Sequence, residues 1–228
     1  MTPLELSLLE QGSPEWKQAR VGLVTASRSG ELISTTKRGE SAARRNYRTE
    51  LVCEILTGQP YPRYVSAEMQ WGSEQEPFAR AAYELDRDVL VEQCGFVLHP
   101  EISRFGCSPD GLVGSDGLLQ IKCPNTSTHL TWMMGQAVPV EHKAQMLAEM
   151  ACTGRAWCDF VSYDPRLPAH LQLFIQRFDR DEQAVANLEA AVVHFNSEIA
   201  NYMSQLPGGP QLVVETLDKA AVDERDWY

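Results

Sequence analysis

The chain of 228 residues is 43% hydrophobic, and its 20 basic and 31 acidic side chains give a formal net charge of −11. A chain of this length can bury the core of one sizeable α/β domain, and no apolar run approaches the length of a membrane span. The acidic balance excludes a uniformly basic nucleic-acid coat. It leaves room for a local basic channel, because charges in solution are screened within about 10 Å at ordinary salt.

The start of the chain and its cysteines predict a cytoplasmic protein without a membrane partner. The first residues lack the basic and apolar regions of a signal peptide. The six cysteines contain no Cys-x-x-Cys pair and no zinc-ligand spacing, so reduced and mostly buried thiols are expected. From the chain length we expect a single domain over residues 1–228, and from the composition of its end an acidic, mobile tail from about residue 208.

Helix signals begin at Ser13, which can cap a helix that has Pro14 at its first position and ends at Arg20. A second helix can be capped by Thr25, with Ser27 close behind. Free backbone amides at a helix start, two hydroxyls and a nearby arginine suit a phosphate. Helix capping beside an ordinary surface arginine explains the same residues without a ligand, so both interpretations stay open.

The most basic part of the chain spans residues 35–48, on a loop and the first turns of a helix that Thr57-Gly58 ends. Its cations stand out against the net negative charge and predict contact with a DNA backbone, the alternative being a solvated helix face. They are Lys37, Arg38, Arg44, Arg45 and Arg48.

A long helix is expected over residues 67–85, with Phe78 and Leu85 among its core positions. Glu76 lies in the middle of this helix. Its carboxylate could point at the central hairpin described next as an oxygen ligand, or it could be an exposed helix acid.

Residues 104–124 have the pattern of two short strands joined by a tight turn. The first runs from Phe105 to Val113 and is broken at Pro109-Asp110-Gly111, and the second runs from Leu118 to Cys123. Alternation along that strand puts Gln120 and Lys122 on one face. Asp110 sits at a bend in the first strand, so its carboxylate could meet both side chains at one spot. Such a group suits a hard divalent cation beside a phosphodiester, although an ordinary hairpin with a solvated Asp and Lys has the same spacing.

The second half of the chain continues to alternate helices and strands. In the helix over residues 140–152, His142, Gln145 and Glu149 share one polar face. The mixture predicts an α/β fold in which a central mixed sheet is flanked by helices. The other helices are expected over residues 126–134 and 181–205, and the strands over residues 157–163 and 171–177.

Several separated motifs keep a fixed order along residues 16–166. They are Trp16…Arg20-x-Gly22-x-x-Thr25-Ala26-Ser27, Thr57-Gly58, Trp71-Gly72-x-x-x-Glu76, Ser108-Pro109-Asp110-Gly111-Leu112, Lys122-Cys123-Pro124-x-Thr126-Ser127, Ala144-Gln145 and Tyr163-Asp164-Pro165-Arg166. The Pro-Asp and Gln-x-Lys pair resembles the motif of the PD-(D/E)XK nuclease superfamily. Together the motifs resemble one subgroup of it, the lambda exonuclease family of YqaJ-like phage recombination alkaline exonucleases.

The resemblance implies a restriction-endonuclease-like core and a site for Mg²⁺, in which Mn²⁺ can substitute. Lys122 would position or deprotonate the attacking water, and Gln145 would orient the scissile phosphate or a water. The implied metal ligands are Glu76, Asp110, Gln120 and the backbone carbonyl of Ile121.

The resemblance also implies a substrate and partners. Enzymes of this family processively degrade one strand of duplex DNA from its 5′ end and leave 3′ single-stranded overhangs for recombination. They act as homotrimer rings together with a single-strand annealing protein, in the bacterial host of a phage or prophage. Met69 falls on the family's apolar wedge at the duplex end, although a methionine at a helix start is also a common core filler. The implied 5′-phosphate pocket comprises Arg20, Thr25, Ser27 and Ser108.

Gln120 departs from the family pattern, which has Asp or Glu at this position. A neutral amide still offers one oxygen but removes a full negative charge, so weaker metal binding and slower hydrolysis, up to loss of activity, are expected. The swap preserves shape and is compatible with a natural variant and with an engineered one. Three functions stay open: the exonuclease, a site-specific endonuclease on the same core, and a non-catalytic clamp on DNA ends.

Overall fold

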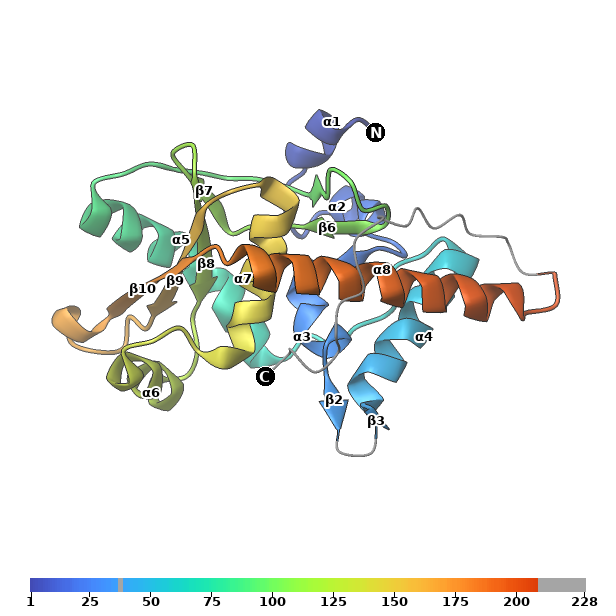
Figure 1. Ribbon diagram of the computed structural model, residues 1–228. Coiled ribbons are helices and arrows are strands. Elements are labelled where there is room, and N and C mark those ends of the chain that lie inside the picture. The colour runs from blue at the N-terminus through green and yellow to red at the C-terminus, as the bar shows by residue number, and fades with distance from the viewer. Residues whose placement is uncertain (37–38, 209–228) are drawn as a thin grey trace.

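The computed structural model of the protein describes residues 1–36 and 39–208. Figure 1 shows the larger group of strands at one side, a group of helices at the other, and α7 between them. The predictions for Lys37, Arg38 and the acidic tail lie outside the described residues. Within the described ranges, no helix is long and apolar enough to cross a membrane.

The larger sheet has five strands in the order β10-β9-β8-β7-β4. The central pair β8–β9 is parallel and the other neighbouring pairs are antiparallel, so the expected mixed sheet is confirmed. Strand β8 is buried along almost its whole length, as is typical of a strand covered on both faces. The strands are β4 (Val91–Glu92), β7 (Gly111–Val113), β8 (Gly117–Lys122), β9 (Trp157–Tyr163) and β10 (Leu173–Asp179).

A second sheet has three strands in the order β1-β6-β5. Strand β6 of this sheet forms from the first half of the strand predicted over residues 105–113. Strand β7 of the larger sheet forms from the second half. The chain leaves one sheet for the other around Pro109, which has no N–H to give to a ladder. Asp110 therefore lies where the two sheets separate. The three strands are β1 (Val24–Thr25), β5 (Val97–Leu98) and β6 (Phe105–Cys107), and β2 (Thr35–Thr36) and β3 (Gly39–Glu40) form a separate hairpin.

The helices begin and end close to the predicted positions. The Ser13 hydroxyl accepts the backbone N–H of Trp16, and Gly58 and Gly154 end their helices in the left-handed conformation, with φ of 66° and 69°. The helices are α1 (Pro3–Ser7), α2 (Pro14–Ala19), α3 (Ser29–Leu32), α4 (Ala42–Thr57), α5 (Ala67–Arg87), α6 (Thr126–Gly135), α7 (Val140–Thr153) and α8 (Glu182–Ser204), with 3₁₀ turns η1 (Ala26–Arg28) and η2 (Ala169–Leu171).

Helix α7 has two buried apolar faces. Met146 and Met150 pack with Leu118 of β8 in one cluster, which faces the larger sheet. Ala148 and Cys152 belong to another cluster, which includes α4 and α8. Because α7 is enclosed on both sides, Glu149 in its middle is withdrawn from solvent.

Helix α5 covers the opposite face of the larger sheet, and its orientation corrects the sequence prediction. Ala79 and Tyr83 are buried against β8 and β9, and the Tyr83 hydroxyl donates to Asp159 Oδ2 at 2.9 Å. Phe78 and Leu85, predicted as core residues, are 61% and 87% exposed. The two are seven residues apart and share one stripe of the helix, so fixing Tyr83 inward turns both outward.

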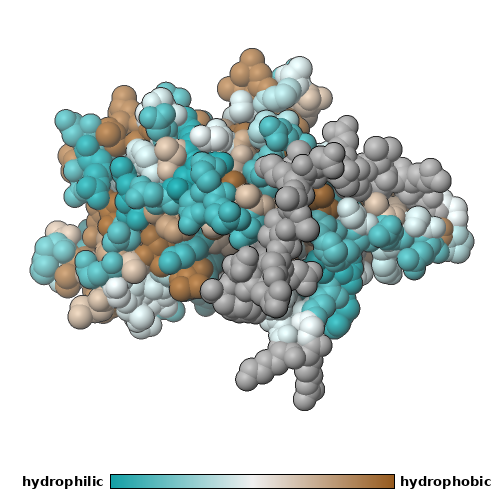
Figure 2. Space-filling model, viewed as in Figure 1, coloured by the Kyte–Doolittle hydropathy of each residue, from teal (hydrophilic) through white to brown (hydrophobic). Residues whose placement is uncertain are grey.

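The surface and the thiols agree with the composition. Hydrophilic side chains cover much of the face shown in Figure 2, with apolar side chains between them. All six cysteines are free thiols and four of them are buried, which confirms the prediction of reduced, mostly buried cysteines.

Candidate active site

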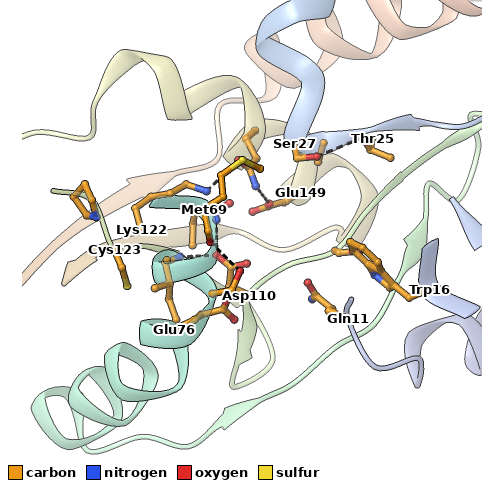
Figure 3. A pocket seen from close by; sticks show the side chains of 18 of the residues that line it. Gln11, Trp16, Thr25, Ser27, Met69, Glu76, Asp110, Lys122, Cys123 and Glu149 are labelled. Carbon is orange, nitrogen blue, oxygen red and sulfur yellow. Dashed lines mark hydrogen bonds between the residues drawn. The ribbon is translucent and has the colours of Figure 1, made fainter. Parts of the chain in front are cut away.

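A cavity of about 520 Å³ opens beside β8 and the break between β6 and β7. Figure 3 shows Asp110, Glu76, Glu149 and Lys122 around one part of it and Trp16, Thr25 and Ser27 around another. The two groups implied by the resemblance, which the sequence spreads over more than 120 residues, thus line one cavity. The implied residues in its lining are Arg20, Thr25, Ser27, Met69, Glu76, Ser108, Asp110, Gln120, Ile121, Lys122 and Gln145.

Asp110 is held by strand β8. Its Oδ2 accepts the backbone N–H of Ile121 at 2.7 Å and the side-chain amide N–H of Gln120. Burial raises the pKa of the Asp110 carboxyl, and the charge of Lys122 partly opposes that shift. The meeting of Asp110 with Gln120 predicted from the strand pattern is therefore present.

Glu76 reaches the same cavity from α5. Arg80, one turn further along the helix, donates to Glu76 Oε1 at 2.7 Å and to the backbone carbonyl of Asp110 at 3.2 Å. Burial and the neighbouring charge of Asp110 raise the pKa of Glu76 to about 7. Sequence reasoning missed Arg80, although its spacing of four from Glu76 is the usual one for an ion pair on a helix.

A chain of polar contacts leads from β8 into α7. Lys122 Nζ donates to Gln145 Oε1 at 3.5 Å, and Gln145 Nε2 donates to Glu149 Oε1 at 2.8 Å. Glu149 is fully buried, and burial, followed by the charge of Asp110, raises its pKa to about 8. The sequence placed Glu149 on the right helix face but assigned it no role. The available signal was an acid enclosed by Ala148 and Met150 in an apolar stretch.

Arg20 anchors the other part of the cavity. Its guanidinium carbon lies 3.9 Å from the centre of the Trp16 ring, and its Nη2 donates to Ser27 Oγ at 3.5 Å. Arg20 Nε is buried and has no hydrogen-bond partner among the described residues. Burial lowers the pKa of Arg20 to about 10, so the group remains a cation at neutral pH with donors to spare.

The hydroxyls predicted for the phosphate pocket surround Arg20. Thr25 Oγ1 and Ser27 Oγ lie 3.4 Å apart, and Ser108 Oγ accepts the Trp16 indole N–H at 2.9 Å. Thr25 ends β1 and occupies the N-cap position of the 3₁₀ turn η1, as predicted, but its side chain makes no capping bond. Its hydroxyl is therefore available to the cavity.

The oxygen donors beside β8 fit a hard cation. In the part of the chain that the structure describes, no three His, Cys, Asp or Glu side chains form a ready-made metal site. Asp110 and the Gln120 amide nevertheless offer hard oxygen ligands, and Ile121 lies next to them in the cavity lining. Gln120 is 1% exposed, and its Oε1 has no hydrogen-bond partner among the described side chains and backbone groups. Mg²⁺ commonly takes one or two carboxylates and keeps several waters, so this set suits it.

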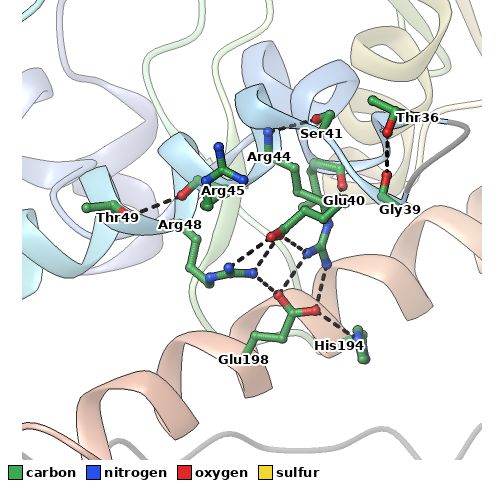
Figure 4. Close-up of polar contacts among 11 residues, drawn as sticks. Thr36, Gly39, Glu40, Ser41, Arg44, Arg45, Arg48, Thr49, His194 and Glu198 are labelled. Carbon is green, nitrogen blue, oxygen red and sulfur yellow. Dashed lines mark hydrogen bonds and ion pairs between the residues drawn. The ribbon is translucent and has the colours of Figure 1, made fainter.

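The predicted DNA-binding arginines of α4 lie outside this cavity. Figure 4 shows Arg44 and Arg48 in ion pairs with Glu40 and Glu198, at N–O distances of 2.7–2.8 Å. These pairs tie α4 to α8 and neutralise both cations. Arg45 is exposed and points away from this network, so DNA contact by Arg45 stays a prediction.

Comparison with known proteins places the chain in a family. A family model described as "YqaJ-like viral recombinase domain" matches residues 15–156, more than half of the sequence. The chain belongs to this family. No curated protein matches it.

Solved structures support the same assignment. An alkaline exonuclease from Laribacter hongkongensis, LHK-Exo, is 46% identical over 83% of this chain and 94% of its own, with a TM-score of 0.77. The complex of LHK-Exo with dAMP has the same identity and coverage and a TM-score of 0.78. The resemblance to lambda-type exonucleases and the nuclease fold class are thus confirmed. A phage-related exonuclease from Haemophilus somnus, 15% identical over 80% of this chain and 96% of its own with a TM-score of 0.64, shares the fold.

The buried acids of this family member predict a pH-dependent stability when no cation is present. The folded state raises the pKa of Glu76 to about 7 and of Glu149 to about 8, from an ordinary value near 4.5. The stability that their protonation provides is therefore complete below about pH 4.5 and is lost as the pH rises through 7 and 8. We expect the melting temperature in EDTA to fall between pH 6 and pH 9, and Glu149→Gln to reduce that fall. Glu141→Gln, at an exposed acid of the same helix, is the control, and a wild-type–variant difference that stays constant with pH would contradict the expectation.

Proposed function

We propose that the protein is a Mg²⁺-dependent exonuclease that degrades one strand of duplex DNA from its 5′ end. One observation carries the proposal: an anion-binding group around Arg20 and a group of hydrolytic type around Asp110 and Lys122 line a single cavity. Membership of a viral recombinase family and 46% identity to an alkaline exonuclease support a nuclease role. A phosphate pocket next to the reaction centre favours cutting at a chain end.

The terminal 5′ phosphate would bind at Arg20. The guanidinium is oriented by stacking on Trp16 and keeps a buried, unpaired Nε within the described structure. Bidentate hydrogen bonds from guanidinium to phosphate are strong and geometrically specific. The hydroxyls of Thr25, Ser27 and Ser108 line the same cavity and can donate to the remaining phosphate oxygens.

The scissile phosphodiester would then lie between Asp110 and Lys122. Asp110, Gln120, Glu76 and the Ile121 carbonyl would hold a divalent cation, and such an ion would polarise the phosphate as a Lewis acid and acidify water. Lys122 is held at Gln145 by a 3.5 Å hydrogen bond, from which its amine can orient the attacking water and take part in its deprotonation. Gln145, bonded in turn to Glu149, fixes the position of that amine.

Exposed apolar side chains suit the wedge and the trimer that the family resemblance implies. Met69 lines the cavity and is 58% exposed, which suits a wedge against the terminal base pair better than a core filler. Phe78 and Leu85, on one stripe of α5, and Leu90 just beyond the helix are 61%, 87% and 83% exposed, which leaves apolar side chains available for a subunit contact. We propose a homotrimer that encloses the duplex and leaves 3′ overhangs for an annealing partner.

A second function, a clamp that binds DNA ends without cutting them, is favoured by Gln120. The phosphate pocket does not depend on this residue, whereas cation binding loses a charge with it. A site-specific endonuclease on the same core is less well supported, because the anion-binding group shares the cavity with the hydrolytic group.

One gel experiment separates the three functions. The protein is incubated with Mg²⁺ and linear duplex DNA that carries a 5′ phosphate, with Lys122→Ala as the control for contaminating nucleases. Progressive loss of one strand from its 5′ end is the expected result. Fragments of defined size would indicate the endonuclease, and DNA that is shifted but uncut would indicate the clamp.

Arg20→Ala should abolish most of the preference for 5′-phosphorylated ends. Hydrogen bonds to a charged group contribute about 1.5–3 kcal/mol, so the ratio of dissociation constants for 5′-hydroxyl and 5′-phosphate duplexes should fall roughly 10- to 100-fold. Fluorescence anisotropy in EDTA measures this ratio without turnover. Arg87→Ala, at an arginine 47% exposed and outside the cavity lining, is the matched control. A preference that survives Arg20→Ala would place the phosphate elsewhere.

Met69→Ala should reduce unstacking of the duplex end while leaving the fold intact. Because the side chain is 58% exposed, the melting temperature should hardly change, whereas a buried methionine would cost about 2–5 kcal/mol. The fluorescence of 2-aminopurine in the terminal pair should rise on binding of the wild type and much less with the variant. Met134→Ala, at an 81% exposed methionine outside the cavity lining, is the control. Equal fluorescence with Met69→Ala would contradict the wedge.

A further inference from the structure

Two buried side-chain oxygens line the cavity without a partner. Gln120 is 1% exposed and Glu149 is 0% exposed. Neither Gln120 Oε1 nor Glu149 Oε2 has a hydrogen-bond partner within residues 1–36 and 39–208. A buried polar atom without a partner is unfavourable, and two such oxygens in residues that line one cavity suit the binding of a cation.

The contacts place both oxygens on one side of the cavity. Gln120 and Lys122 share a face of β8, and the hydrogen bonds from Lys122 to Gln145 and from Gln145 to Glu149 bring the α7 carboxyl to that face. Gln120 is in turn bonded to Asp110. In Figure 3 the side chain of Glu149 lies beside that of Asp110, and the two are close enough for the charge of Asp110 to act on Glu149.

A structural role does not account for Glu149. The nearest cation on β8, Lys122, donates to Gln145 and not to this carboxyl. The single bond that Glu149 accepts from Gln145 engages Oε1 only. An amide or an apolar side chain would fill the same place between Ala148 and Met150 without burying an ionisable group.

We propose that Glu149 replaces the anionic metal ligand that Gln120 has lost. Asp110 and Glu149, beside Glu76, would provide negatively charged oxygens for the divalent cation, and Gln120 a neutral one. The charge of the site is thereby retained while its source moves from strand β8 to helix α7. This inference rests on the proposed metal-dependent function. It replaces the expectation that Gln120 weakens metal binding, because Glu149 supplies the charge that Gln120 lacks.

The test is a double-mutant cycle on metal affinity without DNA. Mn²⁺ binding is measured from the electron paramagnetic resonance signal of free Mn²⁺, and Mg²⁺ binding by calorimetry, on wild type, Glu149→Gln, Gln120→Glu and the double variant. Glu149→Gln should weaken binding at least about 10-fold in the wild-type background. In the Gln120→Glu background the same change should alter affinity less than about 3-fold, because position 120 then carries the charge.

Two controls define the result. Glu141→Gln removes an exposed acid from the same helix and should leave affinity unchanged. Melting curves in EDTA establish that each variant is folded. Glu149→Asp keeps the charge but shortens its reach and should give an intermediate affinity, so it serves as the test if Glu149→Gln folds poorly.

The inference would be overturned if Glu149→Gln left affinity unchanged, or weakened it by the same factor in both backgrounds. The exonuclease proposal is tested separately by the gel experiment. Uncut DNA together with a non-additive cycle would remove the exonuclease and leave the metal ligand. Digested DNA with an additive cycle would do the reverse.

Discussion

The bond between the Asp110 carboxylate and the backbone N–H of Ile121 joins the break between the two sheets to the centre of the larger one. A residue paired within a strand points its side chain above or below the sheet. A carboxylate that accepts a backbone N–H of the neighbouring strand must therefore lie where the chain leaves the ladder. Pro109 enforces that departure. The cavity, with residues from the three-stranded sheet on one side and from β8 on the other, exists because of this junction.

Helix α7 is the second determinant of the site, since it is packed between two apolar clusters. Its enclosure removes water from Glu149 and strengthens the hydrogen bond that this residue accepts from Gln145. The same enclosure makes an unpaired carboxyl unfavourable in the absence of a cation. Under the proposed role of Glu149 as a metal ligand, stability without the cation and cation binding would be opposed at this residue.

The distribution of cations explains how an acidic protein could still bind DNA. Arg44 and Arg48 are neutralised by Glu40 and Glu198 and stabilise the contact between α4 and α8. Arg20, in contrast, stacks on an aromatic ring and faces the cavity. A net charge of −11 would repel DNA from most of the surface, so attraction concentrated at Arg20 would favour binding of an end over binding along the duplex.

The sequence by itself determined the features that depend on neighbouring residues. Caps at Ser13, Gly58 and Gly154 set helix ends, strand alternation brought Gln120 and Lys122 to one face, and ordered motifs identified the family. Only the tertiary structure decided which stripe of α5 is buried, because the Tyr83 bond to Asp159 joins residues 76 apart. The pairing of Arg44 with Glu198 and the burial of Glu149 likewise depend on helices that meet only in the folded chain. Local patterns report backbone geometry, whereas charge and burial at a site are set by contacts distant in sequence.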